Sequence, residues 1–462
     1  MAELGRAGRA ATGATTAGRV LCAIPAVYLL GIVSYAMLNG PDYTTAAPQL
    51  IRYVVAPLAI AGVFVWAALA GNGERAAMFG AYGCAILTAL FLHEAVATSR
   101  LTRSVATNAE KLYDRSDMAA DYFATLPPGA TARTLAARMD NPNLKSVLLG
   151  GLPGRQTLLC TGDDDRALAY RADRFGFNNP DDVYNAGELD VAIFGDSFIE
   201  GMCLESGTDV AAGVRRTAPR TASFGFRGAG PLMELSALGR FGPVLRPKLS
   251  VIVYYAGNDW ENLEMELREP WLREALKPGA DFGDAEVAPA EIDAVDGVID
   301  SLWQEDDDGL SRYRARVWRN FLALSQTWAA LGLHYPAAAK QQPEFQTIVA
   351  RMREIASGWG GELLFIYVPR AERFRGGLSN DFAFGQARRQ VFDAVRKENI
   401  PIIDFVDALA TEAEPLTFYA ENGHFSPKGA AYIADLIAAY ADDRFFDEAP
   451  EIADAAPADE ET

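Results

Sequence analysis

Three long apolar runs near the start of the chain are its clearest pattern of hydrophobic and polar positions. Residues 20–40, 54–73 and 76–92 contain no charged side chain, and each is close to the length that a helix needs to cross a bilayer. The pattern predicts three transmembrane helices, at about 20–40, 54–73 and 76–93, which together form a membrane anchor at 1–103. A buried core helix is the alternative for the last run, and a cleaved signal peptide is the alternative for the first.

The charges beside these runs favour one orientation. Three arginines precede the first run: Arg6, Arg9 and Arg19. Because arginine-rich flanks tend to stay in the cytoplasm and the first helix usually dominates, we expect a cytoplasmic N-terminus. Three crossings of an inner (cytoplasmic) membrane then place the large C-terminal part outside the cytoplasm, as a periplasmic domain.

A second pattern begins at residue 189, where short β-prone apolar runs alternate with amphipathic stretches. The predicted strands are 190–194, 221–226, 249–255, 362–368 and 400–405. The predicted helices lie near 209–216, 232–238, 345–358, 385–397 and 428–440. This alternation predicts an α/β domain at 189–445, with a mainly parallel sheet and helices on both faces.

Three further segments complete the predicted organisation. Residues 104–188 form a juxtamembrane lead-in to the α/β domain. From about 260 to 342 there is no strand signal, which indicates a helical insertion; it serves either as a lid or partner surface, or as a plain helical decoration. Residues 446–462 are acidic and rich in Ala and Pro, which predicts a disordered tail.

The composition of the chain excludes one class of binding partner. The 462 residues carry a formal net charge of −19, which argues against a nucleic-acid binder, because such proteins normally show a basic face. Nothing in the sequence calls for a cofactor or a metal ion. Two of the four cysteines, Cys160 and Cys203, lie in the part expected outside the cytoplasm, where an oxidising compartment would permit a disulfide between them.

Candidate catalytic side chains follow the predicted strands. A Gly-Asp-Ser turn ending in Ser197 follows the first strand, Gly228 follows the second and Asn258 the third, while His424 lies in the loop after the fifth, three residues beyond Glu421. The carboxyl ends of parallel strands meet at one edge of a sheet, so we expect these residues to lie together. A serine there needs a base, the base needs an acceptor, and an oxyanion needs N–H donors.

Four short motifs carry a family resemblance. Gly195-Asp196-Ser197, Gly228, Gly257-Asn258-Asp259 and Glu421-x-x-His424, in that order, resemble the four blocks of the GDSL/SGNH hydrolase superfamily. Residues 173–180 also resemble the segment that precedes Gly-Asp-Ser in membrane-anchored relatives of bacterial envelopes. The resemblance implies a flavodoxin-like three-layer α/β/α fold.

The resemblance also implies roles for individual residues. Ser197 would be the nucleophile and His424 the base, and the oxyanion hole would consist of the Ser197 and Gly228 N–H groups with the Asn258 side chain. The family acid is usually aspartate, so either Glu421 serves as the acid or the triad is a dyad. The neighbouring glycines at 225 and 230 are alternatives to Gly228.

Together these features predict a membrane-anchored serine esterase. Its substrate would be a small ester or an acylated carbohydrate, such as an envelope glycan. An O-acyltransferase that uses the same Ser–His site, together with envelope polysaccharide machinery, is the first alternative, because the superfamily includes both reactions. A non-catalytic binding module is the second alternative, and it predicts loss of the site residues.

Overall fold

The computed structural model divides the chain into two compact units. The described residues are 2–44, 47–70, 72–113, 126–127, 129–161, 167–185, 187–286, 288–304, 317–331, 342–375 and 381–445. The helical unit comprises Met1–Met118, Ser301–Pro343 and Pro369–Ala394. The α/β unit comprises Ala119–Asp300, Glu344–Val368 and Val395–Thr462. The tail predicted at 446–462 lies outside the described residues.

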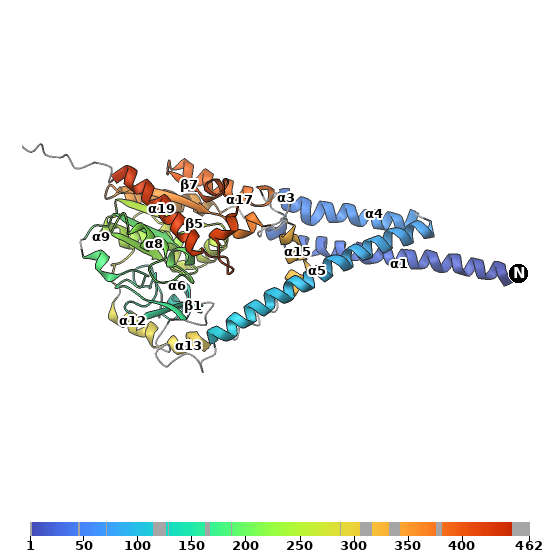
Figure 1. The fold of residues 1–462 in the computed structure, drawn as a ribbon, viewed down its shortest axis with the longest axis horizontal. Coiled ribbons are helices and arrows are strands. Elements are labelled where there is room, and N and C mark those ends of the chain that lie inside the picture. Colours follow the sequence, from blue (N-terminus) through green and yellow to red (C-terminus); the bar gives the residue numbers. More distant parts are fainter. Residues whose placement is uncertain are drawn as a thin grey trace, which may run out of the picture. The chain divides into compact units, whose positions relative to one another are not determined.

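The helical unit contains the three helices that the apolar runs predict (Figure 1). They are α1 (Ala2–Leu38), α4 (Ala56–Ala70), which continues the π-helix η1 (Ile51–Val55), and α5 (Gly73–Tyr113). The parts that are long and apolar enough to cross a membrane are Thr16–Leu38, Ile51–Ala70 and Gly73–Arg100. Each is of the length that a bilayer requires.

Glycines let α1 and α5 approach each other closely. A Cβ atom on Gly80 would lie 2.7 Å from the backbone nitrogen of Cys22, and one on Gly18 would lie 2.7 Å from the backbone nitrogen of Ala77. Such contacts between small residues are typical of helices that pack inside a lipid bilayer. The shorter elements assigned wholly or largely to this unit are α2 (Gly40–Tyr43), α3 (Ala47–Leu50), α13 (Ile299–Gln304), α15 (Ser325–Ala330), η5 (Ala371–Phe374) and α17 (Asp381–Lys397).

A parallel five-stranded sheet forms the centre of the α/β unit. Its strands are β3 (Val191–Gly195), β4 (Thr221–Gly225), β5 (Leu249–Tyr255), β6 (Glu362–Val368) and β7 (Ile402–Asp404). They are ordered β4-β3-β5-β6-β7, and every neighbouring pair is parallel. This is the flavodoxin-like order, in which the chain changes direction between β3 and β5, so the predicted fold class is confirmed.

Both faces of the sheet are covered. Every residue of β3 and β4 is buried, without the alternation of a sheet that has one wet face. Among the covering helices, α9 packs against β3 and β4, and α19 packs against α8. The helices of this unit are α6 (Ala132–Ala136), η3 (Asp181–Tyr184), α7 (Ser197–Glu200), α8 (Val210–Val214), α9 (Pro231–Leu245), α10 (Asp259–Glu266), α11 (Pro270–Arg273), η4 (Glu274–Leu276), α12 (Pro289–Asp296), α16 (Pro343–Ser357), α18 (Phe405–Ala408), η6 (Pro415–Phe418) and α19 (Pro427–Phe445).

The segment before the first sheet strand protects the sheet edge. The Asn179 side chain accepts from the Ser223 N–H at 2.7 Å and donates to the Ser223 carbonyl at 2.8 Å, so it pairs with edge strand β4 as another strand would. Asn179 is itself held by buried Asp173, whose carboxylate accepts its amide at 2.9 Å and the Tyr184 hydroxyl at 2.7 Å.

A disulfide ties the lead-in to the region after Ser197. Strands β1 (Gln156–Thr161) and β2 (Ala167–Arg171) form an antiparallel hairpin. Cys160 of this hairpin is bonded to Cys203, which lies six residues after Ser197. The link connects two segments that are 43 residues apart in the sequence.

Candidate active site

Ser197 begins a short helix directly beyond strand β3. Asp196 is the N-cap of α7, and its carboxylate accepts the Phe198 N–H at 2.9 Å. The helix starts tightly against the sheet, because a Cβ atom on Gly195 would lie 2.6 Å from Ile199 and one on Gly225 would lie 2.7 Å from the Glu200 nitrogen. The two strand-end glycines therefore make the room that brings the serine to the carboxyl edge of the sheet.

His424 comes from the loop between η6 and α19. This loop is closed by a bridge between Tyr419 and Phe425 and by the Asn422 side chain, which accepts the His424 N–H at 3.0 Å. The His424 ring lies 4.9 Å from the ring of Phe198, centroid to centroid. Its Nε2 atom lies 2.9 Å from Ser197 Oγ, which is hydrogen-bond distance across 227 residues of sequence.

The surroundings of His424 keep its imidazole neutral. Burial, and after it the positive charge of Arg227, lower the pKa of His424 to about 4. At neutral pH the ring is therefore uncharged and able to accept a proton at Nε2.

Glu421 does not join the pair. Its side chain is exposed, and within the described part of the chain the buried Nδ1 atom of His424 has no hydrogen-bond partner. The structure thus brings Ser197 and His424 together and leaves the expected acid apart from them. The loop conformation that decides this is set by tertiary packing, which the Glu-x-x-His spacing does not reveal.

Gly228 is the glycine whose backbone suits an oxyanion donor. It has a φ of +72° in the turn closed by the Ala229 N–H on the Phe226 carbonyl, a conformation that favours glycine. The N–H groups of the two alternatives are engaged, that of Gly225 with Ser223 Oγ at 3.3 Å and that of Gly230 with Glu266 at 2.6 Å. No such bond involves the Gly228 N–H among the residues that the structure describes.

Asn258 lies beside the serine turn. It follows β5, the neighbour of β3 at the point where the strand order reverses, and it is the N-cap residue of α10, although its side chain makes no capping hydrogen bond. Its side chain interacts with the Asp196 carboxylate, which lowers the pKa of Asp196 against the effect of burial. Asn258 Oδ1 is buried and has no partner within the described residues.

A buried ion pair, Arg227 with Glu200, supports the site. The guanidinium holds the Glu200 carboxylate through Nε at 2.9 Å and through Nη2, and the side chains are 4% and 0% exposed. Tyr170 Oη donates to Glu200 at 3.0 Å, and Arg227 Nη1 donates to the Leu158 carbonyl at 2.8 Å, so the pair joins α7 to the lead-in hairpin. The sequence motifs did not reveal this pair, although Arg227 directly precedes Gly228 and Glu200 is the last residue of the serine helix α7.

Four buried carboxyl groups lie in mutual electrostatic contact near the serine turn: Asp196, Glu234, Asp259 and Glu266. Burial raises the pKa of Asp196 to about 6 and that of Glu266 to about 7. Burial and the neighbouring carboxylates raise the pKa values of Glu234 and Asp259 further. Burial thus favours the neutral form of these carboxyl groups. Across the described residues no group of His, Cys, Asp or Glu has the arrangement of a metal site.

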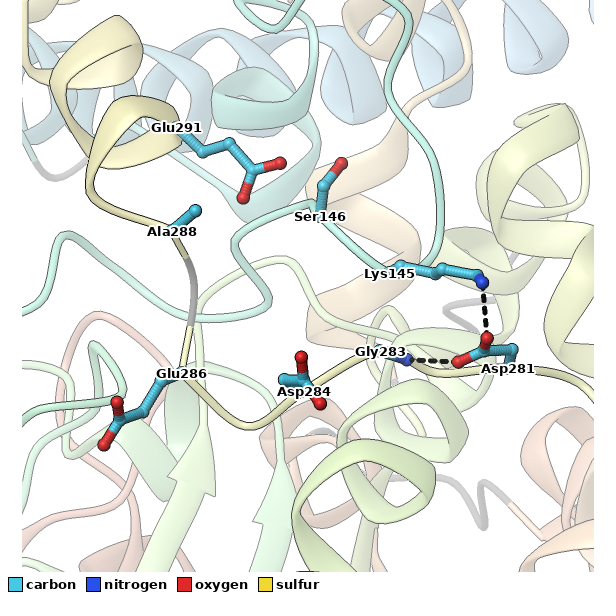
Figure 2. Close-up of a pocket in the computed structure, with 8 residues that line it drawn as sticks. All are labelled: Lys145, Ser146, Asp281, Gly283, Asp284, Glu286, Ala288 and Glu291. Carbon is cyan, nitrogen blue, oxygen red and sulfur yellow. Dashed lines mark hydrogen bonds and ion pairs between the residues drawn. The ribbon is translucent and has the colours of Figure 1, made fainter.

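A pocket elsewhere in the α/β unit is lined by other residues (Figure 2). Its walls are mainly acidic, and its one lysine, Lys145, pairs with Asp281. Both of these side chains are more than half exposed. None of the residues that line this pocket belongs to the Ser197 site, so the chemistry of the serine does not involve it.

Neither a protein-family model nor a curated protein matches the sequence. Several solved structures, however, resemble this chain. A lipase/acylhydrolase from Enterococcus faecalis is 13% identical, with a TM-score of 0.31 over 55% of this chain and 95% of the other. A GDSL-like lipase from Bacteroides thetaiotaomicron is 13% identical, with a TM-score of 0.27 over 55% and 87%.

A further neighbour is a two-domain esterase active on acetylated mannans, which is 12% identical, with a TM-score of 0.30 over 59% of this chain and 54% of the other. The solved structures that this chain resembles are therefore a lipase/acylhydrolase, a GDSL-like lipase and an esterase.

Proposed function

We propose that this protein is a membrane-anchored serine esterase that cleaves ester-linked acyl groups. The observation that carries the proposal is the 2.9 Å approach of Ser197 Oγ to His424 Nε2 at the carboxyl edge of the sheet. Open α/β sheets bind ligands at this edge, where the strand order reverses.

The reaction begins with attack by Ser197. Neutral His424 takes the hydroxyl proton on Nε2 while Oγ bonds to the acyl carbon and the carbonyl electron pair moves onto oxygen. The Gly228 and Ser197 N–H groups and the Asn258 amide hold the oxyanion. Its collapse breaks the ester bond, and the leaving alcohol takes the proton from His424. Water then repeats both steps on the acyl-enzyme and regenerates the serine.

Whether the site has a third member depends on what accepts a hydrogen bond from Nδ1 of His424. In the proposed mechanism the base works with Ser197 as a dyad, since no acceptor meets Nδ1 within the described residues. Glu421 lies in the same loop, three residues earlier, and is the acid that the family resemblance implies. If it orients the base during turnover, its removal will lower the rate as strongly as removal of an acid in a working triad.

The membrane helices and the disulfide support a location for this chemistry. Three helices anchor the protein, and the Cys160–Cys203 bond fits an oxidising compartment outside the cytoplasm. We therefore propose a periplasmic domain, and acyl esters on an envelope carbohydrate as its substrate. Transfer of the acyl group to a glycan hydroxyl instead of water would use the same residues.

The test is hydrolysis of a short-chain nitrophenyl ester by the full chain in nanodiscs. Ser197→Ala and His424→Ala should each lower kcat/KM by roughly 10³-fold or more. Ser357→Ala, on the exposed end of α16, is the matched control and should leave the rate unchanged. Glu421→Ala should stay within about threefold of the wild type for a dyad. Wild-type rates in Ser197→Ala would overturn the proposal.

A further inference from the structure

Residues 317–331 of the helical insertion pack against the membrane-spanning helices. The segment is helical at 317–322, turns at 323–324 and continues as α15. All of its contacts described below lie within the helical unit. The segment therefore belongs structurally with the anchor, although more than 200 residues separate the two in sequence.

The contact is anchored by a buried glutamate of α5. Glu94 is 0% exposed, and its carboxylate accepts the Gln326 N–H at 3.1 Å, the Thr327 N–H at 2.8 Å and the Thr327 hydroxyl at 2.8 Å. The Thr327 hydroxyl also lies 3.0 Å from Nδ1 of His93. A carboxylate of one helix thus caps the first turn of another.

Side chains of α1, α5 and η1 contact the same segment. The Tyr28 hydroxyl donates to the Leu322 carbonyl at 3.0 Å, and the ring of Phe321 lies 5.6 Å from that of Phe91. The Arg52 guanidinium lies 5.3 Å above the ring of Trp328.

These contacts lie within the spans and not beyond their ends. Glu94 precedes Arg100, the end of the α5 span, by six residues, or about 9 Å at the rise of an α-helix. Tyr28 precedes Leu38, the end of the α1 span, by ten residues, or about 15 Å. The hydrocarbon core is about 30 Å thick, whereas the 28 residues of the α5 span extend about 42 Å, so Glu94 lies near the edge of the core and Tyr28 lies well inside it.

The hydrogen bonds are those that an interrupted helix needs in lipid. The break at 323–324 frees the last carbonyls of one helical turn and the first N–H groups of α15. No water is present at that depth to satisfy them, so non-helical backbone is tolerated there only when protein groups do. Tyr28 and Glu94 supply such groups, which also explains an ionisable side chain inside a span.

Three apolar side chains of the segment are exposed. Trp318 is 68% exposed, Leu322 57% and Leu331 42%. We propose that residues 317–331 form a re-entrant element of the membrane anchor, and that these three side chains contact lipid acyl chains in the leaflet where α5 leaves the bilayer. The proposal rests on the membrane anchoring proposed above, and it makes the lipid bilayer the partner surface of the helical insertion.

Site-directed labelling of the full chain in nanodiscs tests this proposal. Single cysteines at 318 and 322, introduced after Cys22→Ala and Cys84→Ala, would carry an environment-sensitive fluorophore. Val63→Cys, in α4 and 48% exposed, is the control for a site in lipid. Val244→Cys, in α9 and 60% exposed, is the control for a site in water. Each label is quenched by brominated lipid from the bilayer or by iodide from the solvent.

Labels at 318 and 322 should be quenched by brominated lipid to at least about half the extent seen at 63, and hardly by iodide, because an interfacial element buries its apolar face at the acyl boundary. Iodide quenching equal to that at 244 would overturn the inference. Protection from both quenchers would also overturn it, since a second copy of the chain would then cover the segment. Loss of lipid quenching at 63 as well would mean that the anchoring proposal itself has failed.

Discussion

The pH dependence of activity tests the environment of His424 most directly. Burial and the charge of Arg227 lower the pKa of His424 from 6.5 to about 4. The acid limb of kcat/KM reports the base of the free enzyme, so we expect it near pH 4. At pH 5.5 a base with that pKa is about 97% deprotonated, whereas an ordinary histidine is about 9% deprotonated. At pH 5.5 a base with a pKa of about 4 therefore predicts a rate about ten times that predicted for an ordinary histidine.

The released nitrophenol is not ionised in acid, so the reaction is followed at the isosbestic wavelength of nitrophenol and nitrophenolate. Rates are measured between pH 3.5 and 8, and enzyme from each pH is also returned to pH 7 to separate titration from unfolding. Asp196→Asn is the control variant, since Asp196 titrates at about 6 beside the serine. A limb near pH 6.5 that persists in Asp196→Asn would refute the reasoning.

Activity is the better readout because stability has opposing contributions. The folded-state pKa of His424 lies below its unfolded value, so the neutral ring contributes to the free energy of unfolding above pH 6.5. This contribution is lost as the pH falls towards 4, and its full size is about 3 kcal/mol. The folded-state pKa values of Asp196 and Glu266 are raised to about 6 and 7. Their contributions have the opposite sign, because the folded state binds more protons there and loses stability as the pH rises through that range.

Three further predictions concern the support of the site. Arg227→Met leaves Glu200 buried without its partner and should lower the free energy of unfolding by about 3–5 kcal/mol, read as a fall in the thermal midpoint; an unchanged midpoint would contradict the role of the ion pair. Gly228→Ala should lower kcat/KM more than Gly187→Ala, because both have positive φ but only Gly228 has a neighbour, 2.7 Å from the added Cβ; equal effects would remove Gly228 from the oxyanion hole. Cys203→Ser removes a disulfide that spans 43 residues and should lower the free energy of unfolding of the domain by about 4 kcal/mol. Denaturant unfolding measures this loss, and reductant should destabilise the wild type but not the variant; wild-type curves that are equal with and without reductant would contradict the bond.

Local sequence patterns predicted the helices and strands of this protein. Uncharged runs of bilayer length became membrane-type helices, and β-prone runs between amphipathic stretches became a parallel sheet. Such patterns report burial on one or both faces, which depends on residues a few positions apart. They also foretold that Ser197, Asn258 and His424 follow strands, so their meeting at one edge required only that the strands be parallel.

Tertiary structure decided which side chains meet within that edge. The spacing of Glu421 and His424 suggested a triad, yet the loop exposes Glu421 and leaves His424 Nδ1 without an acceptor in the described residues. The sequence left Gly225 and Gly230 as alternatives to Gly228, and the hydrogen bonds made by the N–H groups of these two glycines distinguish them from Gly228.

The sequence by itself therefore determined the three membrane-type helices, the succession of strands and helices along the chain and the residue types at the sheet edge, because each follows from a pattern within one element. Only the tertiary structure determined the Arg227–Glu200 pair, the raised pKa values of the buried carboxyl groups beside the serine and the docking of residues 317–331 on Glu94. Each of these is an interaction between groups on separate elements. Their strength depends on burial and on the loss of water, which no local pattern encodes.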